Sequence, residues 1–213
     1  MNNELVTNYL KPLGVYIAVL AVILLLRLFI PGEFSFSLAA ILMFSVPFLL
    51  RSEMRCLRWD ARGFLIGLAV TLVILIIYLS IVLALTENKI NISELTISLI
   101  LVQLFLVSVP EEVFFRGYLQ EKIGNNLKGI LFVSLLFALG HFCTLCILSG
   151  FIGDVCAQSI LTFFPSIIMG YLYARTGTLW GSIIFHFFSN IAFISTGALN
   201  IFYDFYLLIH HML

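Results

Sequence analysis

Long apolar runs recur along almost the whole chain, and they constrain its fold more than any other feature. A helix that crosses a bilayer needs about 20 mostly apolar residues. Such runs lie at 13–30, 36–50, 63–86, 96–116, 129–147, 155–174, 178–196 and 199–213. Because a backbone within lipid must satisfy its own hydrogen bonds, these runs are predicted to be helices. Eight spans are expected, with seven as the alternative because the second and last runs are short.

The composition requires lipid around the chain. Hydrophobic residues make up 62% of the 213 residues and charged residues only 10%, against about 25% charged in a typical soluble domain. Four Cys are too few for a secreted disulfide scaffold. The 11 Lys and Arg balance the 11 Asp and Glu, which leaves no basic excess for a nucleic-acid partner. We predict an all-α polytopic membrane bundle, with residues 1–213 as a single integral-membrane domain and lipid as a partner.

The basic residues predict an orientation, because cytoplasmic loops collect Lys and Arg. With the amino terminus inside, eight spans place most of them in the cytoplasm: Lys11, Arg51, Arg55, Arg58, Arg62, Lys122, Lys128 and Arg175. Lys89 falls in an outer loop, and Arg27 lies near the outer end of the first span. Both termini are then cytoplasmic. We expect no cleavable signal peptide and favour a prokaryotic plasma membrane, with the endoplasmic reticulum as the alternative.

A pair of glutamates in the fourth run is the first feature that is energetically costly within a bilayer. The segment 110–116 reads Pro-Glu-Glu-Val-Phe-Phe-Arg. Glu112 and Arg116 are four residues apart, so they share a helix face and can form an ion pair. Glu111 points about 100° away from Glu112 around the helix, which leaves it free to face another group. The alternative interpretation is a charge cluster at the cytoplasmic end of a span.

Two later runs carry histidines. His141 ends the segment 137–141, and alone it could be a hydrogen bond between helices. His186 and Asn190 are four residues apart, so they lie on one face of an otherwise apolar helix. Ionisable groups within spans are costly, which makes them functional candidates.

Together these side chains supply what water-mediated hydrolysis of an acyl bond needs. A carboxylate beside an imidazole can deprotonate water as a general base. A second imidazole with an amide can donate hydrogen bonds to the developing oxyanion. The groups are expected toward the cytoplasmic half of their spans. The sequence therefore favours substrate access from the cytoplasm or from the inner leaflet.

Three ordered motifs carry a resemblance to a known family: Glu111-Glu112-x-x-x-Arg116, Phe137-x-x-x-His141 and His186-x-x-x-Asn190. They resemble the motifs of the CPBP family, the CAAX-processing and bacteriocin-processing (Abi) intramembrane proteases, which include the Rce1-type prenyl-protein endopeptidases. The motifs span residues 108–192, which the resemblance makes the catalytic core. The earlier spans match the family only in being hydrophobic.

The resemblance implies a role for each motif residue. Glu111 and His141 would activate the attacking water, and His186 with Asn190 would form the oxyanion hole. The implied enzyme is a glutamate-type intramembrane endopeptidase. Its substrate would be a peptide or a membrane-anchored protein, and whether that substrate carries a prenyl group stays open.

Glu112 and Arg116 would orient the site, and Glu112 could share the acid/base work. The resemblance implies no obligatory cofactor, although the family was formerly described as metal-dependent. Imidazole and carboxylate are ordinary zinc ligands, so a bound zinc would fall to Glu111, His141 and His186. We favour the metal-free interpretation, because Arg116 beside the carboxylates would compete electrostatically with a divalent cation.

Other kinds of intramembrane protease fit the sequence poorly. The zinc site-2 type needs His-Glu-x-x-His, and neither His141 nor His186 is followed by Glu. The nearest match to a rhomboid-like Gly-x-Ser-Gly, at 147–150, lacks the first Gly. The aspartyl motifs are incomplete and in reversed order, at 151–154 and 203–204.

The alternative function is non-catalytic: a membrane immunity or scaffold protein, or a proton-coupled transport protein that retains the fold. Buried Glu and His side chains also serve as proton relays. Transporters usually show paired halves with interrupted helices, and the sequence shows no such symmetry.

The cysteines are predicted to be inert. The Cys143-x-x-Cys146 spacing could indicate metal or redox chemistry, but it lies in a span and lacks a partner pair. Cys56 and Cys156 complete the set. All four are expected to act as small apolar fillers.

Overall fold

The structure, a computed structural model, describes residues 3–50, 52, 54–85, 90–91 and 95–196. Every regular element in these residues is a helix, which confirms the predicted all-α class. Six helical segments of the described chain are long and apolar enough to cross a membrane, and a shorter apolar helix follows them. They account for the first seven predicted runs. The eighth run, 199–213, lies outside the described residues, as do Arg51 and Lys89.

The amino-terminal part of the chain supplies three long helices. Helices α1 (Asn3–Phe29) and α2 (Gly32–Leu49) form a hairpin around Pro31, whose fixed φ suits the residue before a helix. A single 3₁₀ turn, η1 (Arg55–Leu57), precedes α3 (Ala61–Leu85). Much of α3 is exposed apolar surface, which includes Leu65 and Ile76. It is therefore suited to contact lipid.

The fourth span is a continuous but uneven helix, and two of its turns are wider than α-helical. Its segments are α4 (Ile97–Val102), η2 (Gln103–Ser108), α5 (Val109–Phe114), η3 (Phe115–Gln120) and α6 (Glu121–Ile123), of which η2 and η3 are π-helical. Pro110, in the first turn of α5, has no N–H to donate and crowds the carbonyl four residues earlier. A π turn just before it accommodates both effects.

The remaining helices complete the bundle. Helix α7 (Leu127–His141) continues into the π-helical η4 (Phe142–Ile147), and α8 (Gly153–Leu161), α9 (Phe163–Thr176) and α10 (Trp180–Ser195) follow. The Asn126 side chain caps α7 by accepting a hydrogen bond from the Gly129 N–H at 2.9 Å. Gly177 ends α9 in the left-handed conformation, with φ of 71°.

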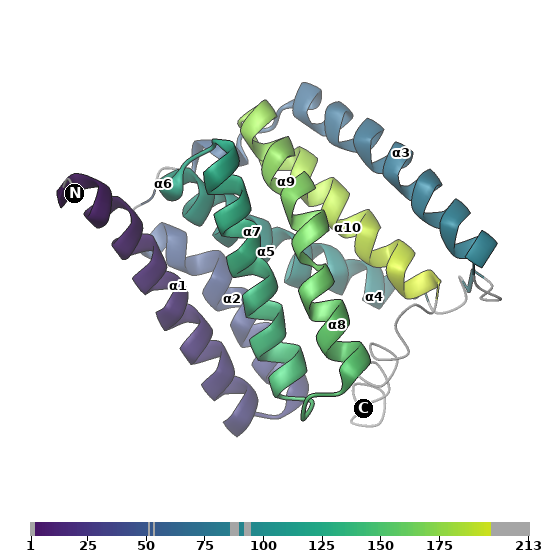
Figure 1. Cartoon of the computed structure of the whole chain (residues 1–213), viewed down its shortest axis with the longest axis horizontal. Coiled ribbons are helices and arrows are strands. Elements are labelled where there is room, and N and C mark those ends of the chain that lie inside the picture. The colour runs from purple at the N-terminus through teal and green to yellow at the C-terminus, as the bar shows by residue number, and fades with distance from the viewer. Residues whose placement is uncertain (1–2, 51, 53, 86–89, 92–94, 197–213) are drawn as a thin grey trace.

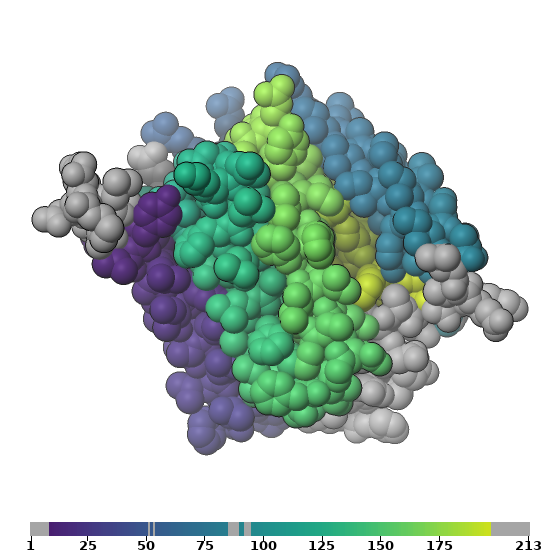
Figure 2. Space-filling model, in the orientation of Figure 1, coloured from purple at the N-terminus to yellow at the C-terminus, as the bar shows by residue number. Residues whose placement is uncertain are grey.

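The bundle has two ends, visible at the top and bottom of Figure 1. We call one the basic end, because its loops and helix termini carry Arg55, Arg58, Arg62, Lys122, Lys128 and Arg175. The other, the disulfide end, carries the turns at 30–31 and 148–152. Between them α7, α8 and α9 cover one face, with α1 on one side and α3 on the other (Figure 2).

Two contacts between helices fix the frame around the site. A Cβ atom on Gly67 would lie 2.3 Å from the Gly181 Cα, so the backbones of α3 and α10 touch where both residues lack a side chain. The buried Tyr16 hydroxyl on α1 donates to the Leu136 carbonyl of α7 at 2.7 Å. Helix α3 therefore positions α10, and helix α1 positions α7.

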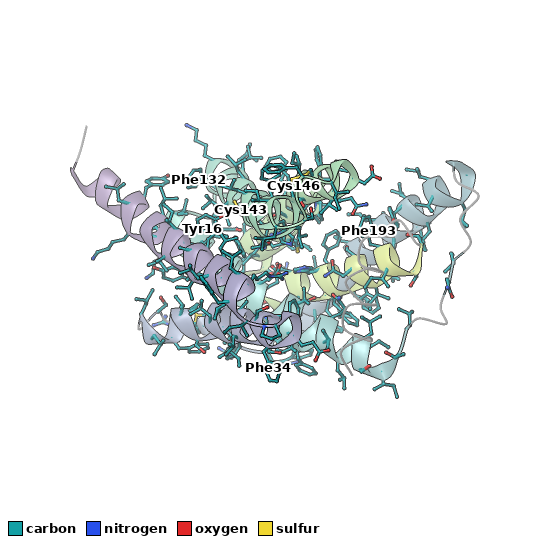
Figure 3. The ribbon with its side chains drawn as sticks, turned by 90° about the horizontal axis from the view of Figure 1, so that it is seen from below. Tyr16, Phe34, Phe132, Cys143, Cys146 and Phe193 are labelled. Carbon is teal, nitrogen blue, oxygen red and sulfur yellow. A yellow bond between two sulfur atoms is a disulfide. The ribbon has the colours of Figure 1, made fainter. Side chains whose placement is uncertain are left out.

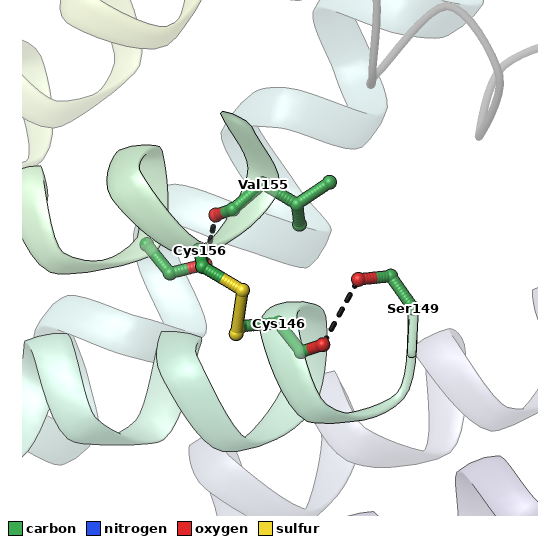
Figure 4. Close-up of a disulfide and its surroundings, with 5 residues drawn as sticks. Cys146, Ser149, Val155 and Cys156 are labelled. Atoms are coloured by element: carbon green, nitrogen blue, oxygen red, sulfur yellow. Dashed lines mark hydrogen bonds between the residues drawn. A yellow bond between two sulfur atoms is a disulfide. The ribbon is translucent and has the colours of Figure 1, made fainter. Parts of the chain in front are cut away.

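The cysteines are not all inert, and that prediction was wrong. Cys146 at the end of η4 and Cys156 in α8 form a disulfide, with their Cα atoms 4.5 Å apart. The tight turn at 148–152 brings the two helices together, and Ser149 donates to the Cys146 carbonyl (Figure 4). Cys56 and Cys143 remain free thiols. Cys56 is buried at the basic end, and this burial raises its pKa, so the thiol stays protonated at neutral pH.

Candidate active site

Five of the six predicted site residues lie within one group of contacts at the centre of the bundle. Helix α5 contributes Glu111 and Glu112, and η3 contributes Arg116 one turn later. His141 is the last residue of α7, and His186 lies in the middle of α10. Three segments separated along the sequence therefore converge, as the prediction required.

Glu112 and Arg116 are the most enclosed members of the group. Both side chains are 0% exposed, and the Arg116 Nη1 donates to the Glu112 Oε1 at 3.0 Å. The same oxygen lies 2.9 Å from the His186 Nδ1. The predicted ion pair along the helix is confirmed, and His186 is an additional partner. A buried charge with two charged or hydrogen-bonding partners is one that a protein interior tolerates.

Arg116 is fixed from two further directions. Its Nη2 donates to the Ser166 carbonyl at 3.0 Å and to the Ser166 Oγ at 2.8 Å. Its guanidinium carbon lies 4.9 Å from the centre of the Phe137 ring, within the range of a cation–π contact. Arg116 thus ties α5 and η3 to α9 and α7. Ser166 was not predicted, and its place within the apolar run 155–174 gave little signal.

Glu111, about 100° around the helix from Glu112, has looser contacts. Its Oε2 lies 3.9 Å from the His141 Nε2 and 3.8 Å from the His186 Nε2, both beyond hydrogen-bond length. The buried Oε2 accepts no hydrogen bond. The side chains of Glu111 and His141 are 14% and 23% exposed. This half of the site is therefore less enclosed than the Glu112 half.

The hydrogen bonds of the imidazoles assign their tautomers. The His141 Nδ1 lies 3.0 Å from the Phe137 carbonyl, which can only accept, so Nδ1 carries a hydrogen. In the neutral ring the His141 Nε2 then accepts. His186 Nδ1 likewise donates to the Glu112 carboxylate. Glu111 and His141 thus present two acceptors to each other, an arrangement that a donor such as water can bridge.

Asn190 has a partner that the sequence analysis missed. It lies one helical turn beyond His186, and its Nδ2 donates to the Gln103 Oε1 at 3.1 Å. Gln103, in η2, is only 5% exposed although it lies within an apolar span. An uncharged amide among apolar residues was the one available signal. One of the two Asn190 N–H hydrogens is used in this bond, and the other is left for a ligand.

The depth of the site differs from the prediction. His141 lies fourteen residues into α7 from the basic end, which is about 21 Å along a helix that rises 1.5 Å per residue. His186 lies six residues from the same end of α10, or about 9 Å. The group therefore lies near mid-depth of the bundle and does not keep to its basic half. All three π-helical segments adjoin it, as π turns often do at functional sites.

The side chains as placed do not fit a zinc ion. Zinc binds nitrogen and oxygen ligands that converge at about 2.0–2.2 Å from the metal. Within the described part of the chain, no group of three or more His, Cys, Asp or Glu side chains is arranged to hold a metal ion. In addition, Glu112 and Arg116 already fix the orientation of His186.

Comparison with known proteins matches part of the chain to one family. Residues 93–192 match the Rce1-like family model, described as type II CAAX prenyl endopeptidase Rce1-like. No curated protein and no solved structure is similar enough to count as a match. The matched segment contains all three motifs and every residue of the group described above. This match, over just under half of the chain, supports the Rce1-like family assignment that the motifs predicted.

Proposed function

We propose that the chain is an intramembrane endopeptidase that hydrolyses a peptide bond with a water molecule held between Glu111 and His141. The observation that carries this proposal is the pair of facing acceptors, 3.9 Å apart. A gap of that length is too long for a direct hydrogen bond and suits a bridging water. The Rce1-like family supports a protease with a membrane-associated peptide or protein as its substrate.

The first chemical step is attack by that water on the scissile carbonyl. The water oxygen forms a bond to the carbonyl carbon while its proton passes to the Glu111 carboxylate, and His141 accepts the other O–H. General bases of this kind contribute about 10²–10⁴ in rate. Because the His141 Nδ1 is bonded to the Phe137 carbonyl, its Nε2 stays turned toward the water.

The tetrahedral intermediate needs donors for its oxyanion. The second N–H of Asn190 is one candidate. His186 is the other, and because its Nδ1–H is committed to Glu112, its Nε2 can donate only as an imidazolium. Collapse of the intermediate breaks the C–N bond, and the proton on Glu111 passes to the leaving amine.

The direct test is cleavage by the purified full chain in detergent, where the substrate can reach the site from any side. The probes are a panel of fluorogenic peptides, some prenylated near a CAAX terminus, some acylated and some unmodified. The natural chain is expected to cleave at least one class. Glu111→Gln and His141→Ala are expected to lower kcat by about 10³ and 10², in line with the loss of a general base.

A matched variant guards against a contaminating protease. Glu121→Gln removes an exposed carboxylate from the same span and should cleave at the parent rate. Equal activity in the parent, Glu111→Gln and His141→Ala proteins would overturn the proposal. If the chain instead confers protection or transport that survives both site substitutions, the non-catalytic alternative is correct.

A further inference from the structure

A cavity of about 310 Å³ lies at the basic end, between the start of α3 and the end of α9. It is lined by Asp60, Arg62, Ile66, Arg175 and Thr176. Figure 1 shows the two helix ends side by side at the top of the molecule. Ligand pockets enclose about 300–1,000 Å³, so the cavity is large enough for a small group. The residues of the candidate active site do not line it.

Two arginines of the lining carry charges that the protein does not neutralise. In the part of the chain that the structure describes, neither Arg62 nor Arg175 forms an ion pair or a side-chain hydrogen bond. The Asp60 carboxylate is already engaged, because its Oδ1 and Oδ2 accept the backbone N–H groups of Arg62 and Gly63 at 3.2 and 2.8 Å. Two guanidiniums beside one cavity repel each other, and an anion between them removes that cost.

The backbone beside the cavity is closely packed. A Cβ atom on Gly63 would lie 2.5 Å from the Thr178 Oγ1 and 3.3 Å from the Thr176 Cβ. Helix α3 approaches the turn after α9 this closely because residue 63 lacks a side chain. One turn further along α3, Gly67 meets Gly181 of α10 in the same way. The two arginines are therefore presented by helix ends whose relative position is fixed.

Both tryptophans of the chain lie beside this cavity, and they indicate its depth in the membrane. Trp59 precedes Asp60, and Trp180 begins α10 four residues after Thr176. The two rings meet edge to face with their centroids 5.0 Å apart, and the Trp180 Nε1 donates to the Arg58 carbonyl at 3.2 Å. Tryptophan concentrates at the level of the lipid headgroups. The cavity therefore lies at that level.

One helical turn deeper, each arginine is accompanied by an exposed side chain that suits lipid. Leu65 on α3 and Tyr171 on α9 are both 60% exposed. They lie three and four residues from Arg62 and Arg175, so each shares a helix face with its arginine. Figure 3 shows α3 at the outer edge of the bundle, on the opposite side from α1 and Tyr16. Cations at headgroup level thus stand above exposed apolar surface, in the order of a phospholipid's phosphate and acyl chains.

We propose that the cavity between α3 and α9 binds the phosphate group of an anionic phospholipid of the cytoplasmic leaflet, with Arg62 and Arg175 as its ligands. The planar guanidinium fork matches pairs of phosphate oxygens. Basic pockets between membrane helices bind anionic headgroups on the cytoplasmic side, to which the positive-inside rule assigns this end. The lipid joins the start of α3 to the end of α9. This site is independent of the proposed function, because it uses none of the same residues.

The experiment uses the two tryptophans as local reporters. The full chain is reconstituted in phosphatidylcholine vesicles, and phosphatidylglycerol brominated on its acyl chains is added in rising proportion. Bromine quenches tryptophan on contact, so the quenching reports how strongly that lipid binds beside the cavity, with brominated phosphatidylcholine as the reference. Arg62→Gln/Arg175→Gln removes the proposed ligands. Lys122→Gln/Lys128→Gln is the matched control, because it removes the same charge from exposed positions at the same end.

The parent protein is expected to bind phosphatidylglycerol at least tenfold more strongly than phosphatidylcholine, since each basic residue near the membrane surface strengthens such binding by about fivefold. The arginine variant should lose this preference, and the lysine variant should keep it. An equal preference in the parent and the arginine variant would overturn the proposal. An equal loss in the two variants would also overturn it, because the charge of the whole surface would then account for the binding.

Free phosphate is the other source of the same chemical group. Inorganic phosphate at about 10 mM should relieve the quenching no more than sodium chloride of equal ionic strength does. Greater relief by phosphate would assign the cavity to a soluble ligand and overturn the lipid. Native mass spectrometry of the detergent-purified proteins gives a second measurement. The parent should retain phosphatidylglycerol that the Arg62→Gln/Arg175→Gln protein loses, and equal retention would contradict the proposal.

Discussion

Glu111 and Glu112 are neighbours in sequence, yet the two sides of the site that they enter differ in burial and in the closeness of their partners. On the Glu112 side, one oxygen accepts from both Arg116 and His186, and the pair with Arg116 is fully buried. On the Glu111 side, the nearest imidazole nitrogens stand 3.8 and 3.9 Å away, and the carboxylate is partly exposed. One carboxylate has two close partners within the protein, and the other has none within hydrogen-bond length at its Oε2.

The difference shows how an apolar bundle can hold a reactive acid. A charge without partners is energetically costly at this depth. A reactive acid therefore needs neighbouring groups that stabilise the fold and do not themselves react. Arg116 and Glu112 supply a neutralised anchor, and His186 lies between the two sides with one nitrogen toward each glutamate. We infer that the Glu112 side carries stability and the Glu111 side carries chemistry.

The largest effect is expected from breaking the Glu112 side. Arg116→Met removes the cation and leaves a buried carboxylate unpaired, which typically costs about 3–5 kcal/mol. It also removes the two hydrogen bonds to Ser166. The free energy of unfolding in mixed micelles, followed by circular dichroism, measures the loss.

Glu111→Gln is the matched change on the other side of the site. It removes a charge that interacts with Arg27 and with two imidazoles beyond hydrogen-bond length, so it should destabilise the chain clearly less than Arg116→Met does, by about 1 kcal/mol. If Glu111→Gln destabilises the chain as much as Arg116→Met, the division between the two sides is wrong.

The sequence predicted the stable side of the site better than the reactive side. The four-residue spacing of Glu112 and Arg116 is a local property of any helix, so their ion pair followed without knowledge of the fold. The contacts of His186 with Glu112 and of Asn190 with Gln103 join helices 74 and 87 residues apart. Only the packing of α10 beside the fourth span determines them.

The helices were also predicted from a local property of the sequence, and the features that were missed again depend on contacts between segments. Apolar length alone predicts a helix in lipid, and seven of the expected runs are helical in the described residues. The disulfide depends on the turn that brings Cys146 to Cys156, and the depth of His141 depends on where α7 begins. Neither is a property of a single run.

An intermediate effect is expected from Gln103→Leu. It tests whether the reactive side of the site extends to Gln103. Gln103→Leu removes the acceptor that orients the Asn190 amide, and a lost positioning bond of about 1.4 kcal/mol corresponds to a tenfold fall in rate. The fall should appear in kcat with KM unchanged. Gln103→Glu keeps an acceptor for Nδ2 and should recover most of the rate, whereas equal losses in both variants would show that Gln103 only fills space.

The smallest effect is expected from removing metal ions, and it tests whether Glu111 acts as a base or as a ligand. A base held beside a neutral imidazole needs no cation. Dialysis against a strong zinc chelator should therefore change kcat by less than about twofold. A tenfold change would correspond to about 1.4 kcal/mol. The control is a known zinc peptidase treated in the same buffer. Loss of cleavage that returns on addition of zinc would instead assign Glu111, His141 and His186 as ligands. The 3.8 and 3.9 Å separations would then have to close around a metal, and the open side of the site would be an incomplete coordination sphere.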